Sequence, residues 1–61
     1  MELKLIRLPE VINRTGLSRS SIYQLMRTGD FPENIKLSQR SVAWESRAID
    51  EWIHLKISGK N

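Results

Sequence analysis

Four polar residues in the middle of the chain recur at the i, i+3, i+4, i+7 spacing of one helix face. They are Ser20, Tyr23, Gln24 and Arg27, and the cation Arg19 lies next to them in the first turn. Such side chains supply the donors, acceptors and positive charge that reading base edges and holding phosphates in a DNA major groove require. The alternative is an ordinary solvated face, which usually mixes Glu with Lys. Because positions 17–29 contain no Asp or Glu, the sequence favours the DNA interpretation.

Three further cations are candidates for phosphate contacts: Arg14, Lys36 and Arg40. They lie where positive charge is concentrated, with a net +3 between residues 7 and 27 and a net +2 between residues 36 and 47. A basic patch of this kind attracts polyanions. Arg14 could equally be a solvated charge near a helix end. For Arg40 the second basic cluster favours a DNA contact over an exposed loop Arg without a partner.

Two helices joined by a tight turn, within residues 8–29, are needed to present these side chains. Pro9 suits the first turn of the first helix, predicted over residues 9–14, because its missing N–H costs nothing there. Gly16 suits the left-handed position past its end. Ser18 is a good N-cap for the second helix. That helix carries an apolar stripe at helical spacing, formed by Ile22, Leu25 and Met26.

Two short alternating runs follow, on either side of a polar turn at residues 38–41. One run contains Ile35 and Leu37, and the other contains Val42 and Trp44. The pattern predicts a β-hairpin. A hairpin after a helix-turn-helix is a wing, and this one would hold Arg40 at or near its tip. An Arg there suits a contact beside the minor groove or along a phosphate strand.

The two flanking segments are less regular. Residues 2–8 fit either a short strand or an extended arm, with Ile6 interrupting the alternation of Leu3 and Leu5 with charged residues. Ser46 is the predicted N-cap of a last helix. Its apolar stripe consists of Ile49, Trp52, Ile53 and Ile57. We expect both tryptophans in the core rather than as base-stacking platforms, because a chain this small needs large side chains to close a core.

The 61 residues suffice for one domain, predicted over residues 1–61 as mainly α with a small β-hairpin. With no Cys and one His, neither a disulfide nor a zinc cluster is expected, and no cofactor is predicted. No apolar run approaches a membrane span or a signal-peptide core. We therefore expect a cytoplasmic, nucleoid-associated protein. An enzyme is the least favoured reading, because His54 is the sole imidazole and a chain this small leaves little room for a pocket.

Five segments stand in a specific order and spacing: Leu8-Pro9-Glu10-Val11, residues 15–23, Gly29-Asp30-Phe31-Pro32, Arg40-Ser41-Val42-Ala43-Trp44 and Asp50-Glu51-Trp52-Ile53. Together they resemble the AlpA-type prophage regulators over nearly the whole chain. A generic helix-turn-helix would not also carry the third and fourth segments. The chain departs from the family pattern at Ser21, where Thr is frequent, at Ala48, where Glu is frequent, and near Ser38, where a wing-turn Gly is usual.

The resemblance implies a winged helix-turn-helix, related to the MerR DNA-binding domain and to small phage excisionases. It implies that residues 18–27 form the recognition helix and that Arg40 is the wing Arg. Family members are bacterial, usually encoded on prophages or integrated islands. They regulate transcription, for example of integrase genes, or act as recombination directionality factors that favour excision.

Three functions follow as hypotheses. The first is a sequence-specific DNA-binding transcriptional regulator of a prophage or integrated element. The alternative is an excisionase-like directionality factor that bends DNA for an integrase. A third, a protein-interaction module that borrows the fold, is disfavoured by the acid-free helix face. The expected partner is double-stranded DNA, with an integrase or adjacent copies of the chain as further partners. The candidate DNA-binding residues are Arg14, Ser18, Arg19, Ser20, Tyr23, Gln24, Arg27, Lys36 and Arg40.

Overall fold

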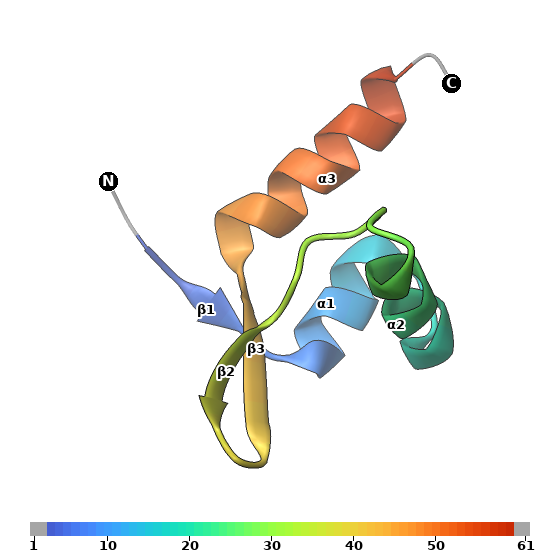
Figure 1. The fold of residues 1–61 in the computed structure, drawn as a ribbon. Coiled ribbons are helices and arrows are strands. Elements are labelled where there is room, and N and C mark those ends of the chain that lie inside the picture. Colours follow the sequence, from blue (N-terminus) through green and yellow to red (C-terminus); the bar gives the residue numbers. More distant parts are fainter. Residues whose placement is uncertain (1–2, 60–61) are drawn as a thin grey trace.

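The computed structural model describes residues 3–59 as three helices and a three-stranded antiparallel sheet (Figure 1). In chain order the elements are β1 (Leu5–Ile6), α1 (Leu8–Thr15), α2 (Arg19–Arg27), β2 (Ile35–Ser38), β3 (Ser41–Glu45) and α3 (Ser46–Ser58). This arrangement confirms the predicted winged helix-turn-helix fold. No helix within the described range is long and apolar enough to cross a membrane.

The turn between α1 and α2 forms as its local sequence predicts. Gly16 adopts φ 74°, in the left-handed region, and its N–H donates to the carbonyl of Ile12 at 2.8 Å. Ser18 then caps α2, because its hydroxyl oxygen accepts a hydrogen bond from the backbone N–H of Ser21. The helix α1 is one residue longer at each end than predicted. The two helices are therefore held at a fixed angle by backbone chemistry that the chain carries locally.

The strand β3 is the centre of the sheet, with β1 on one side and β2 on the other. Ile6 lies opposite Trp44, and Ile35 lies opposite Ala43. Ile6, which interrupts the alternation in the sequence, is 2% exposed, whereas Leu5 is 47% exposed. The apolar pattern of this segment was therefore misleading. Pairing with β3 selects which side chain turns inward, and that pairing is not local.

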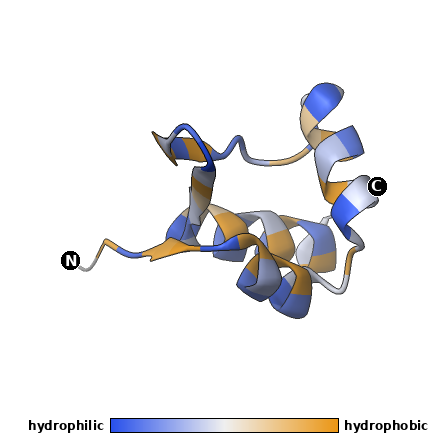
Figure 2. Cartoon of the chain, turned by 90° about the horizontal axis from the view of Figure 1, so that it is seen from below, coloured by the Kyte–Doolittle hydropathy of each residue, from blue (hydrophilic) through white to orange (hydrophobic). Residues whose placement is uncertain are grey.

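The core lies between the sheet and the three helices. Its buried side chains are Ile6, Val11, Ile22, Phe31, Trp44 and Ile49. The prediction that Trp44 is a core residue is confirmed, and its indole N–H donates to the carbonyl of Pro32 at 3.1 Å. In the perpendicular view of Figure 2, hydrophilic and hydrophobic segments alternate along the helices, as expected where one face of each helix is buried.

Three expectations for the last helix need correction. Glu45, not Ser46, is the N-cap of α3, and it makes no side-chain cap hydrogen bond. The Ser46 hydroxyl instead accepts a hydrogen bond from Arg14. Ile57 is 79% exposed, because the end of α3 extends past the body of the domain (Figure 1). Trp52 is only partly buried and lies at the edge of the core rather than inside it.

Candidate nucleic-acid interface

The outward face of α2 is formed by Ser20, Gln24 and Arg27, all of which are exposed. Ile22 is fully buried on the opposite face, so the apolar stripe anchors the helix as predicted. No acidic residue lies on α2. The predicted polar face is therefore formed and accessible, with donors, acceptors and a cation standing side by side.

Tyr23 does not belong entirely to that face, because its ring is half-buried against the core. The ring makes an edge-on contact with Trp44, with centroids 6.3 Å apart and planes at 65°. The Arg19 guanidinium lies 5.7 Å from the centroid of the Tyr23 ring, in cation–π range. The helical spacing predicted Tyr23 on the polar face with Ser20, Gln24 and Arg27. In the structure it packs on the sheet and helps to position Arg19.

A groove of about 470 Å³ separates the start of α2 from the β2–β3 hairpin. Three arginines line it from three different parts of the chain: Arg7 just before α1, Arg19 at the start of α2, and Arg40 at the hairpin turn. Arg7 is fixed there, because its Nε donates to the carbonyl of Val42 at 3.0 Å. Several guanidinium groups that line one groove can bind the phosphates of a DNA backbone.

Arg7 and Gln39 also line this groove and were not among the residues predicted from the sequence. Arg7 belongs to the basic segment counted in the charge pattern, which is a weak signal. What places it beside the hairpin is the pairing of β1 with β3. Gln39 occupies the turn next to Arg40, so the predicted hairpin could have suggested it.

The Arg14 side chain forms ion pairs and a hydrogen bond with other residues of the domain. Its guanidinium pairs with Glu10 at 2.8 Å and with Asp50 at 3.0 Å, and it donates to the Ser46 hydroxyl at 3.0 Å. Only 25% of its side chain is exposed. The expectation of a solvated charge is therefore wrong, and a phosphate contact would require the guanidinium to leave these partners. Arg14 is a clamp that joins α1 to the start of α3.

The hairpin carries its two candidate cations in the open. Lys36 on β2 and Arg40 at the turn are both exposed. The hairpin turn contains no glycine. None of its residues adopts a positive φ, since within residues 3–59 only Gly16 and Gly29 do. Its polar contact is a hydrogen bond from the Arg40 N–H to the Ser38 hydroxyl at 3.4 Å. The predicted position of Arg40 at the wing tip is confirmed.

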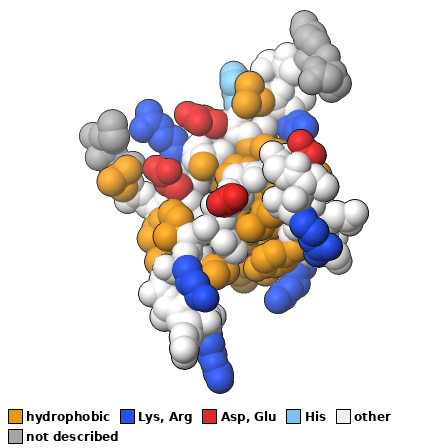
Figure 3. All heavy atoms as spheres, in the orientation of Figure 1, with side chains coloured by type: hydrophobic (Ala, Val, Ile, Leu, Met, Phe, Trp, Pro, Cys, Tyr) orange, Lys and Arg blue, Asp and Glu red, His pale blue; other side chains and the backbone are white. Residues whose placement is uncertain are grey.

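Charge is unevenly distributed over the surface. In Figure 3, Lys and Arg side chains stand over the hairpin tip and around α2, and others stand beside α3. The acidic side chains visible on this face lie higher, around α3 and the loop that follows α2. No group of three or more His, Asp or Glu side chains is placed to hold a metal ion in the described part of the chain.

Comparison with known proteins gives concordant results. The sequence profile of the prophage CP4-57 regulatory protein (AlpA) family matches residues 4–57. Protein ORF88 of Enterobacteria phage P4 is 40% identical over 57 residues, covering 93% of this chain and 65% of that protein. The chain thus spans about two thirds of the length of this phage relative.

A second relative is the DNA-binding transcriptional activator AlpA of Escherichia coli strain K12. It is 35% identical over 57 residues, covering 84% of this chain and 81% of the relative. The matched region includes both helices of the helix-turn-helix, the hairpin and most of α3. A regulatory family of this kind is not an enzyme class. The chain belongs to the prophage CP4-57 regulatory protein (AlpA) family.

Proposed function

We propose that the chain is a sequence-specific DNA-binding transcriptional regulator of a prophage or an integrated element. The observation that carries the proposal is the exposed, acid-free face of α2 beside a groove lined by three arginines. The relative in E. coli is named a DNA-binding transcriptional activator, which supports the same function here. Binding to genomic DNA would place the protein with the nucleoid in the cytoplasm.

In this proposal α2 enters the major groove. Ser20, Gln24 and Arg27 face the base edges, because they are exposed together on the outward face of the helix. An Arg can donate two hydrogen bonds to guanine, and a Gln can form a bidentate pair with adenine. Ser18, at the N-terminus of α2, lies where a helix end meets phosphate. These contacts would provide the sequence preference.

The groove between α2 and the hairpin would hold the DNA backbone. Arg7, Arg19 and Arg40 line it, and Tyr23 forms part of its wall. Lys36 lies further along the hairpin and would extend the contact to a neighbouring phosphate. Phosphate contacts fix the register of a protein on the duplex but do not read sequence. We leave Arg14 out of this interface, because its guanidinium is paired within the protein.

The proposal is tested by footprinting the protein across the DNA around its own gene, followed by a salt titration on the protected duplex. Each neutralised phosphate should contribute a slope of roughly 0.9 in log K against log salt. Four groove and hairpin cations, Arg7, Arg19, Lys36 and Arg40, predict a steep slope. The absence of any protected site, or an affinity indifferent to salt, would overturn the proposal.

An excisionase-like role remains the second candidate, because α2 has nine residues and a lone module this small makes few base contacts. Useful affinity would then come from adjacent copies on DNA or from an integrase. Fold does not separate the two roles. An excision reaction with the cognate integrase in the absence of transcription does so. Stimulated excision would favour the directionality factor, and unchanged excision would favour the regulator.

A further inference from the structure

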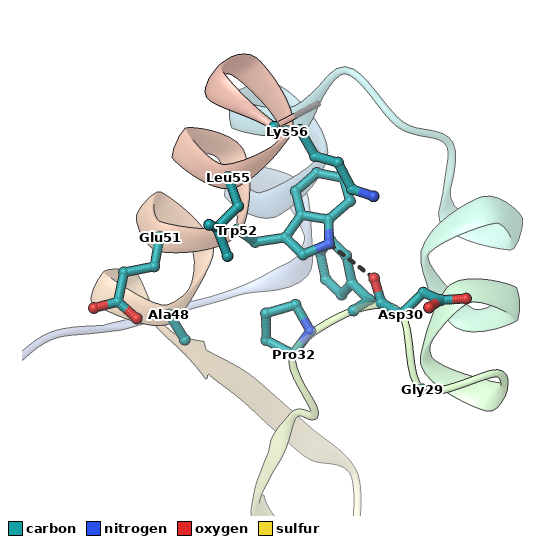
Figure 4. Close-up of a pocket in the computed structure, with 10 residues that line it drawn as sticks. Gly29, Asp30, Pro32, Ala48, Glu51, Trp52, Leu55 and Lys56 are labelled. Carbon is teal, nitrogen blue, oxygen red and sulfur yellow. Dashed lines mark hydrogen bonds between the residues drawn. The ribbon is translucent and has the colours of Figure 1, made fainter. Parts of the chain in front are cut away.

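An exposed groove runs along α3, on the side that faces the loop after α2 (Figure 4). It encloses about 650 Å³. The Trp52 ring packs edge-on against Phe31 at 4.9 Å, and its indole N–H donates to the carbonyl of Asp30 at 2.8 Å. The floor of the groove is thus fixed by contacts within the domain. Beside the groove the apolar side chain of Leu55 is 65% exposed.

The residues that α3 and its C-cap contribute to this groove are arranged symmetrically along the sequence. They fall into three pairs, each centred on the same point between residues 53 and 54: Ala48 with Gly59, Glu51 with Lys56, and Trp52 with Leu55. Each pair matches in chemistry. Two members are small, two carry opposite charge, and two are apolar.

Two identical helices that pack antiparallel about a two-fold axis place such symmetric positions opposite each other. Leu55 of one copy would then cover Trp52 of the other, and Glu51 would face Lys56. Ala48 and Gly59 are small enough to let the helix ends approach. We propose that this face of α3 is the interface of a two-fold dimer of this chain.

The charged pair is placed for this role. The Lys56 ammonium lies 5.5 Å from the centroid of its own Trp52 ring, so its charge stands over the groove. Glu51 is exposed and forms no salt bridge with any residue in the described range. An exposed ion pair adds little affinity but suppresses wrong registers. It would therefore select the antiparallel arrangement, while Leu55 and Trp52 provide most of the apolar contact.

The dimer should be weak in free solution, because a single 13-residue helix offers less area than a standard interface. On DNA the second copy would be held close to the first. This consequence rests on the proposed function. A two-fold dimer presents two copies of α2 and so predicts an inverted repeat in the DNA site.

The first test is sedimentation of the full chain without DNA, from micromolar to millimolar concentration. We expect self-association toward twice the 7.1-kDa monomer mass. E51K and K56E should each weaken it by about tenfold or more, because like charges then face each other. An equimolar mixture of E51K and K56E should restore association, since both charge pairs are opposite again in the mixed dimer. A substitution that merely damaged α3 would not be rescued by mixing.

The second test concerns the apolar contact. Leu55→Asp should abolish association, whereas Ile57→Asp should leave it unchanged. Ile57 is a matched control, because it lies on the same helix, is even more exposed and does not line the groove. A chain that stays monomeric, a mixture that fails to associate, or equal effects of both Asp variants would overturn the proposal.

The two proposals fail separately. Binding of Leu55→Asp to a single half-site should keep its salt dependence if the DNA-binding function is right. A chain that binds DNA but never associates would overturn the dimer alone. A chain that associates but binds no DNA would support the dimer and contradict the proposed function.

Discussion

Gln24 and Arg40 are both exposed, but they lie on different elements and should contribute differently to DNA binding. Gln24 is on the outward face of α2, so Gln24→Ala should cost about 1–3 kcal/mol on the specific site and relax preference at one base pair. Arg40 is at the hairpin tip, so Arg40→Ala should weaken binding to all sequences and lower the salt slope by about 1.

The measurement is a set of salt titrations of both variants on the footprinted duplex and on random duplex of equal length. The division of roles predicts that Gln24→Ala changes the ratio of the two affinities and that Arg40→Ala changes both affinities alike. If both variants alter the specific and random affinities equally, the assigned roles are wrong.

Arg14 and Arg27 provide a second contrast between two arginines of the helix-turn-helix. Arg14 is a clamp to Glu10 and Asp50, whereas Arg27 lies on the exposed face of α2. Arg14→Ala should lower the free energy of unfolding by about 1 kcal/mol, because partly exposed ion pairs contribute little each. Arg27→Ala should leave stability unchanged and reduce DNA affinity. Urea denaturation and a gel-shift titration measure the two effects. The reverse pattern would contradict both assignments.

The turn between α1 and α2 depends on the backbone conformation of one residue. Gly16 has φ 74°, and a Cβ added there would meet no atom within 4 Å. The cost of Gly16→Ala is therefore backbone strain alone, about 1–2 kcal/mol. Gly16→Asn should cost less, because Asn tolerates the left-handed region. Chemical denaturation of both variants checks the order. A Gly16→Ala variant as stable as the parent would show that the turn does not constrain α2.

Elements whose signals are local could be predicted from the sequence, and elements defined by pairing could not. Gly16 and Ser18 act within four residues of themselves, so the turn and the cap of α2 could be predicted. Ile6 is buried because β1 pairs with β3, 38 positions later in register, and its own segment does not record this.

The candidate site divides in the same way. The outward face of α2 could be predicted from helical spacing alone. Arg7 could not, because it reaches the groove through a sheet contact, with its Nε on the Val42 carbonyl. Arg14 was misplaced for a related reason. Its partner Asp50 lies 36 positions away, and nothing near Arg14 in sequence indicates that α3 packs there.

At the scale of the whole molecule, the two tryptophans should differ in their contribution to stability. Trp44 is fully buried in the central strand, whereas Trp52 is partly buried at the groove on α3. Losing a core aromatic costs about 3–5 kcal/mol, which is comparable to the total stability of a domain this small. Trp44→Ala should therefore unfold the chain. Trp52→Ala should destabilise it and leave a cooperative transition.

Circular dichroism and urea denaturation distinguish the two variants. Trp44→Phe is a useful companion, because it keeps an aromatic ring and removes the donor to the Pro32 carbonyl. It should remain folded with reduced stability. If Trp52→Ala unfolds the chain and Trp44→Ala does not, the described core is wrong.

The proposed DNA-binding surface and the proposed dimer surface lie on different parts of the molecule. The face of α2 and the hairpin tip carry exposed cations, and α3 extends away from them (Figure 1). DNA binding at the first surface and self-association at the second can therefore occur together. This separation also allows each surface to be altered without touching the other.

The most direct test of the account places one negative charge at the centre of the exposed face of α2. Gln24→Glu and His54→Glu change the net charge equally, but the second lies on the exposed side of α3. Each variant is titrated against the footprinted half-site, and its folding is checked by circular dichroism. The DNA affinity of Gln24→Glu should fall by about a hundredfold, because its carboxylate would lie close to phosphates and base acceptors. His54→Glu should bind like the parent. Undiminished binding by a folded Gln24→Glu variant would contradict the claim that α2 enters the DNA.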